Sequence, residues 1–176
     1  MLLRGHSLLE PADQARCQEV IETTIYRTAV VENDSATWPT ELGENWHRSK
    51  RLMQFCHGAP GFVVCLARLP GTAADDLLAA AGEATWRAGP LRQGSNLCHG
   101  TAGNGYAFLV LYARTGEARW LARARAFAMH AIAQCDAEAA AIGRPRHSLW
   151  TGDIGLALYL RDCVRSRAEF PTLDVF

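Results

Sequence analysis

Cys56–Gly61 reads Cys-His-Gly-Ala-Pro-Gly, and Cys98–Gly103 repeats the motif as Cys-His-Gly-Thr-Ala-Gly. A third stretch, Trp150–Gly155, reads Trp-Thr-Gly-Asp-Ile-Gly and keeps the two glycines without the Cys-His pair. Each copy leads into an apolar run. The pattern therefore predicts a repeated glycine turn that opens a buried helix.

Apolar and amphipathic runs alternate after each turn. The fully apolar runs predict buried inner helices, at 61–69, 106–112 and about 156–160. The amphipathic runs predict outer helices, one from Thr72 as its N-cap to about 87 and one from 117 to about 135. Upstream, a helix is expected over 11–31 and a long loop over 33–50. Period-two alternation is absent, so we expect no strand.

Hairpins of this kind stack side by side, with inner helices facing the axis and outer helices facing solvent. The expected fold is all-α, and its closed form is an α/α toroid. All glycine turns then lie at one end of the ring. Cys56, Cys98 and His99 can meet at that end although they are far apart in the sequence.

Length and composition are those of one folded domain, residues 1–176. The 18 basic and 18 acidic residues cancel, so no bulk charge favours nucleic acid. No apolar run is long enough for a membrane span, and residues 1–6 are too short and too soon charged for a secretory signal. We therefore expect a cytoplasmic location, in which the six cysteines are free thiols or metal ligands.

Thiolate and imidazole groups are the ligands that zinc prefers. Cys56, Cys98 and His99 would supply three of them and leave a fourth position open, as catalytic zinc sites do. A thiol bound at the open position is deprotonated, so the site suits thiol transfer. His57 is a candidate proton donor.

Other interpretations of the motif stay open. The cysteines could be buried packing residues, or His57 could be the fourth ligand of a closed structural zinc site. A Cys-His nucleophilic dyad is disfavoured, because adjacent side chains point apart and no third member stands out. Arg92, Arg146 and His147 flank the turns, where they could bind an anionic substrate or form solvated basic turns.

Three stretches, residues 55–61, 96–108 and 148–155, resemble the lanthionine synthetase C-like (LanC-like) family. The resemblance covers about 38–176 and implies an α/α toroid with one Zn²⁺ on Cys56, Cys98 and His99. It also implies addition of a thiol, from a peptide cysteine or glutathione, to dehydroalanine or dehydrobutyrine, which forms a thioether. Peptide modification of this kind is the function we expect.

The resemblance is to the C-terminal half of family members, so the chain is expected to form only half of the ring. A second chain or a homodimer could complete it, and the family's upstream acid and base have no counterpart here. Phe55, Gln93 and Thr151 depart from the residues frequent at these positions. The alternative function is a non-catalytic zinc-binding module that docks a peptide or a subunit.

Overall fold

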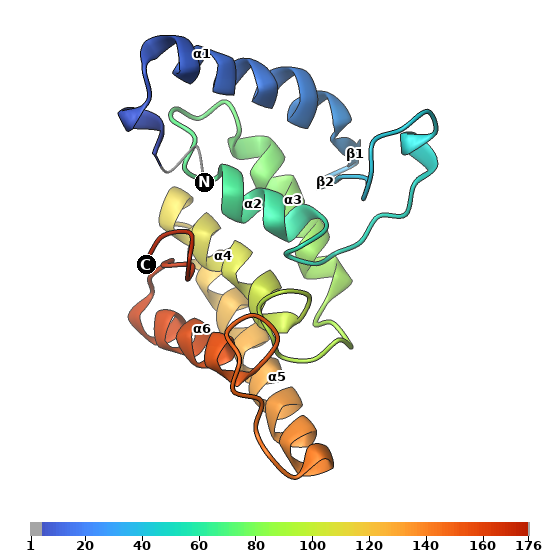
Figure 1. Cartoon of the computed structure of the whole chain (residues 1–176), viewed down its shortest axis with the longest axis vertical. Helices are drawn as coiled ribbons and strands as arrows, with labels where there is room; N and C mark the ends of the chain where they lie inside the picture. Colours follow the sequence, from blue (N-terminus) through green and yellow to red (C-terminus); the bar gives the residue numbers. More distant parts are fainter. Residues whose placement is uncertain (1–4, 176) are drawn as a thin grey trace.

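The computed structural model describes residues 5–175. Part of the segment 1–6, which was considered as a secretory signal, therefore lies outside the described residues. An inner layer of three helices forms one side of the molecule (Figure 1): α2 (Ala59–Leu66), α4 (Thr101–Thr115) and α6 (Asp153–Arg165). α4 lies between the other two and packs against both. Its first eleven residues are all buried, which makes it the centre of the core.

Each inner helix begins directly at its glycine turn. The predicted inner helices are confirmed, but they begin earlier than the apolar runs, at the residue after Gly58, Gly100 and Gly152. These glycines are the N-cap residues. The small and polar residues after these glycines form the first helical turn. A search for apolar runs alone does not include them.

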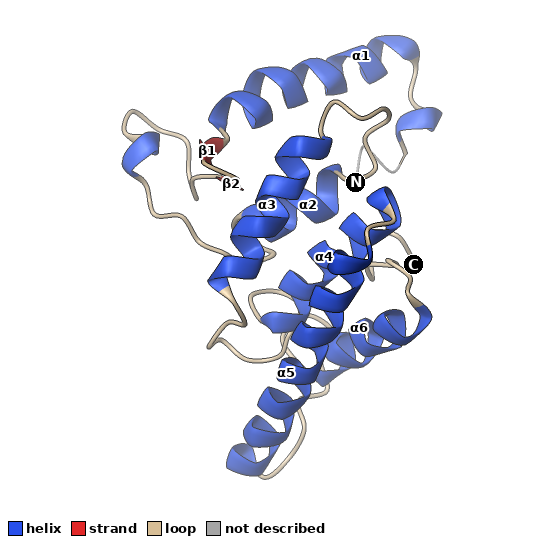
Figure 2. Cartoon of the chain, turned by 180° about the vertical axis from the view of Figure 1, so that it is seen from behind, coloured by secondary structure: helices blue, strands red, loops and turns tan. Residues whose placement is uncertain are grey.

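An outer layer is formed by α3 (Asp75–Ala88) and α5 (Ala118–Ile142), seen from behind in Figure 2. The predicted alternation of inner and outer helices is therefore confirmed. α3 begins at Asp75 without a side-chain cap, so the expected cap by Thr72 is wrong. α5 continues beyond Cys135 because its last turns are rich in alanine, the best helix former.

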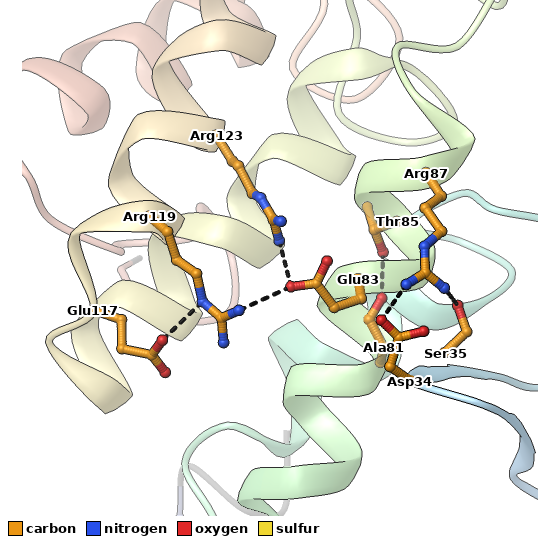
Figure 3. Close-up of polar contacts among 9 residues, drawn as sticks. All are labelled: Asp34, Ser35, Ala81, Glu83, Thr85, Arg87, Glu117, Arg119 and Arg123. Carbon is orange, nitrogen blue, oxygen red and sulfur yellow. Dashed lines mark hydrogen bonds and ion pairs between the residues drawn. The ribbon is translucent and has the colours of Figure 1, made fainter.

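A cluster of charged side chains joins the two outer helices (Figure 3). The Glu83 carboxylate on α3 accepts hydrogen bonds from Arg123 (2.7 Å) and Arg119 (3.1 Å) of α5. The Arg123 guanidinium also lies over the rings of Trp86 and Trp120, at 5.1 and 4.9 Å from their centroids. These side-chain contacts link α3 to α5.

The N-terminal region differs from the sequence prediction. Its short elements are a 3₁₀ turn (His6–Leu8), α1 (Pro11–Val20), a π-helix (Ile21–Tyr26), β1 (Val30–Glu32), β2 (Ser35–Thr37) and a second 3₁₀ turn (Trp46–Arg48). The expected helix to Val31 is therefore too long, and the expectation of no strand is wrong. β1 and β2 pair antiparallel around Asn33, whose positive φ of 57° closes the hairpin. β2 packs on α3 through the fully buried Ala36.

No helix within residues 5–175 is both long enough and apolar enough to cross a membrane.

Candidate metal centre

The three glycine turns are joined by backbone hydrogen bonds at equivalent positions. The Cys56 N–H donates to the Cys98 carbonyl at 3.1 Å, and the Cys98 N–H donates to the Trp150 carbonyl at 2.9 Å. The prediction that the turns gather at one end of the helical layers is borne out by this ladder. Cys56 and Cys98 are consequently neighbours, although they are in different hairpins.

The last glycine of each turn allows its close folding. A Cβ atom at Gly61, Gly103 or Gly155 would lie 2.1, 1.9 or 2.2 Å from a carbonyl oxygen of the same turn, far inside van der Waals contact. The chain thus returns on itself so tightly that only a residue without a side chain fits. This is the physical reason for the recurring glycine in all three motifs.

The exposed Cys56 thiol lies close enough to the half-buried Cys98 thiol for the two to interact. Partial burial, then repulsion by an ionised Cys98, then a hydrogen bond between the two side chains raise the pKa of Cys56 to about 11. The Gln54 side chain accepts a weak bond from the Cys56 sulfur, at 3.7 Å. A pair of neighbouring thiols, one of which has a raised pKa, is a suitable site for a thiophilic cation. The positive charge of the cation would take the place of the thiol proton.

The histidines of the motifs lie on the same turns. His99 is half-buried, and its backbone N–H donates to the Asn96 side chain at 3.1 Å. His57 is exposed. Within the described part of the chain, no group of three or more His, Cys, Asp or Glu side chains is arranged to hold a metal ion. The Cys56–Cys98 pair is the part of the expected ligand set that the fold brings together.

A cavity of about 310 Å³ opens beside the first turn. Cys56 and His57 line it together with mostly apolar side chains, among them Ile25, Phe62 and Leu66. Cys56 therefore has space on one side for a small ligand or a side chain of a larger one.

The basic residues singled out in the sequence are exposed. Arg92 and His147 are solvent-facing, and Arg146 forms an ion pair with Glu138 at 3.1 Å. Arg146 is on the same segment as the third turn, whose Asp153 accepts the Arg146 backbone N–H at 2.8 Å. The charge of the Arg146 guanidinium is thus partly compensated by Glu138.

Sequence reasoning missed the polar residue at the start of two turns. Asn96 accepts the N–H three residues later, and Ser148 accepts the Thr151 N–H in the same way at 3.2 Å. The sequence does contain the signal: Asn96 stands two positions before Cys98, and Ser148 stands two positions before Trp150. Asn and Ser side chains commonly close turns of this kind.

The repeated motifs and the layered hairpins define a class of helical repeat proteins. The profile of the family described as "Lanthionine synthetase C-like protein" matches residues 5–175. The chain belongs to this family, and its hairpins are part of the family's α/α toroid.

Two relatives can be compared directly. "Glutathione S-transferase LANCL1" of Danio rerio is 35% identical over 130 residues, which are 70% of this chain and 32% of that protein. "LanC-like protein GCL1" of Arabidopsis thaliana is 30% identical over 125 residues, 68% of this chain and 28% of that protein. The chain therefore matches about a third of the length of either relative.

Proposed function

We propose that Cys56, Cys98 and His99 bind one Zn²⁺ and that the site adds a thiol to an electrophilic alkene. The observation that carries the proposal is the direct pairing of Cys56 with Cys98, two equivalent residues of separate hairpins. Zinc bound there would supply deprotonation of a coordinated substrate thiol at neutral pH. Glutathione or a peptide cysteine is the proposed thiol, in keeping with the name of the zebrafish relative.

The chain's own residues would then orient the second substrate. The mostly apolar cavity beside Cys56 accepts the alkene-bearing residue, dehydroalanine or dehydrobutyrine. The thiolate sulfur bonds to the β-carbon, and the electron pair of the double bond moves to the α-carbon. His57, exposed at the cavity, donates the proton that the α-carbon takes up and regains one from solvent. Attraction of an anionic substrate is the role we assign to the exposed residues Arg92, Arg146 and His147.

The first test is the metal content of the purified protein. We expect about one zinc per chain, lost in Cys56→Ala, Cys98→Ala and His99→Ala. Cys65→Ala is the matched control, since Cys65 lines the same cavity but is outside the ligand set. Full zinc content in the three ligand variants would exclude the site.

The second test is turnover of glutathione and a dehydroalanine peptide, followed by mass spectrometry of the thioether. His57→Ala should slow the reaction about 10²-fold and leave zinc content unchanged. A protein that binds zinc and the peptide but forms no thioether, alone or with an added protein carrying the remaining hairpins, would instead be the docking module.

A further inference from the structure

The C-terminal segment returns over the inner helices and buries one aromatic ring among them. Phe170 is fully buried, and its ring lies 4.4 Å from that of Phe55, 4.8 Å from Tyr106 and 6.0 Å from Trp150. These three residues belong to the first turn, to α4 and to the third turn. A single side chain therefore contacts elements of all three hairpins.

The backbone of Phe170 is held on both sides by buried carboxylates. The preceding residue, Glu169, donates its N–H to Asp162 at 3.3 Å, and Phe170 donates its own N–H to Asp174 at 2.9 Å. The Asp174 side chain is only 4% exposed and pairs with Arg68 at 2.9 Å. The segment is thus latched to α6 and to the end of α2, and Phe170 has a defined position.

Phe170 reaches the cysteines through Phe55. Phe55 directly precedes Cys56, and its ring stacks on the ring of Phe170 and also on the ring of Trp150, the latter at 5.9 Å. The backbone hydrogen bond between Cys56 and Cys98, and a 2.8 Å bond from the Asn104 side chain on α4 to the Met53 carbonyl, join the first turn to the second hairpin. The Phe170 ring packed against Phe55 adds a side-chain contact that resists rotation of the first turn about these bonds.

We propose that residues 167–175 are a positioning segment of the thiol site, and that Phe170 is the positioning residue that keeps the Cys56 turn in register with the Cys98 turn. The proposal rests on the proposed function only for the identity of the cation. The pairing of the two thiols is a property of the chain itself.

The experiment compares Phe170→Leu with Phe127→Leu. Phe127 is an equally buried aromatic residue that packs against Trp86 and Phe108, away from the turns. Zinc affinity by chelator competition and the absorption spectrum of the Co²⁺-substituted protein are measured well below the unfolding temperature. Phe170→Leu should weaken zinc binding at least about tenfold and shift the Co²⁺ bands, and Phe170→Tyr should restore both.

A second arm needs no metal. Phenylarsine oxide binds two adjacent thiols, so its affinity for the metal-free protein reports the Cys56–Cys98 spacing, with Cys56→Ala and Cys98→Ala as baselines. The affinity for phenylarsine oxide should also fall about tenfold in Phe170→Leu. Wild-type affinities and spectrum in Phe170→Leu, or equal losses in Phe127→Leu, overturn the proposal. A wild-type protein that binds no zinc but shows the arsenical effect refutes the metal proposal alone.

Discussion

Gly103 is the tightest of the three turn-closing glycines. A Cβ atom there would lie 1.9 Å from the Leu97 carbonyl oxygen and 3.0 Å from the Cβ of Phe55. Gly103→Ala therefore pushes apart the turn that carries Cys98 and the turn that carries Cys56. We expect a loss of about 2–3 kcal/mol in the free energy of unfolding, measured by urea denaturation.

Gly43→Ala is the control for this substitution. Gly43 is exposed, and nothing lies within 4 Å of a Cβ placed on it. The alanine there should be neutral or stabilise by up to about 1 kcal/mol. Equal effects of the two substitutions would mean that the close approach at Gly103 does not limit stability.

The positions of the turn glycines and of the paired cysteines could be predicted from the sequence, because a turn geometry that is repeated leaves a repeated local sequence. The pairing of Cys56 with Cys98 followed from that repeat. The packing of Phe170 could not be predicted in the same way. Its contacts to Phe55, Tyr106 and Trp150 come from chain segments that only the tertiary fold brings together.

Arg114, in the last turn of α4, holds the connection between α2 and α3. Its guanidinium pairs with Asp75 at 2.5 Å and donates to the carbonyls of Ala67 (2.7 Å), Leu69 (2.9 Å) and Gly71 (2.5 Å). The side chain is only 10% exposed. One planar group thus satisfies three carbonyls of the connection between α2 and α3.

Replacement of Arg114 by lysine keeps the charge and removes the planar fork. An ammonium group cannot reach three carbonyls and a carboxylate at once, so partly buried acceptors are left unpaired. We expect Arg114→Lys to cost about 2–4 kcal/mol of unfolding free energy, measured in urea.

The matched control for Arg114→Lys is Arg119→Lys on α5. Arg119 also pairs with carboxylates, Glu83 and Glu117, but its side chain is 48% exposed. Water therefore replaces the lost contacts, and the cost should stay below about 1 kcal/mol. A similar cost at both positions would show that burial of the Arg114 network contributes nothing.

The helices could be predicted as elements from the period of their apolar residues, whereas the β-hairpin could not. Its strands are three residues each, too short for alternation to be visible. The usable signal was the pair Asn33-Asp34, because Asn at the first position of a two-residue turn accepts a positive φ. Packing of β2 against α3 then stabilises a hairpin that would be marginal alone.

At the scale of the whole molecule, alkaline pH should destabilise the metal-free protein. Lys50 is the only lysine in the sequence, and arginines stay protonated, so cysteines and tyrosines dominate the titration above pH 9. Burial is the main reason that the pKa of Cys163 is raised from 9.0 to about 11, and burial also raises the pKa values of Tyr106 and Tyr159. All three residues are in the inner layer, on α4 and α6.

The sign of the effect follows from proton binding. Between about pH 9 and pH 11 the unfolded chain has lost thiol protons that the folded chain keeps, so the unfolding free energy falls as pH rises. Below pH 8 these groups do not change the unfolding free energy. Cys163 alone should contribute on the order of 2 kcal/mol over this interval.

Urea titrations at one-unit steps from pH 7 to 11, with a reductant and a chelator present, measure the fall. Cys163→Ala lacks the buried thiol, and should begin less stable at pH 7 because of the lost packing, yet decline less steeply from pH 9 to 11. The difference between the two slopes isolates the Cys163 thiol from the tyrosines, which both proteins share. Parallel slopes would show that the inner layer opens to solvent before its thiol ionises, because an exposed thiol has the same pKa in the folded and unfolded chains.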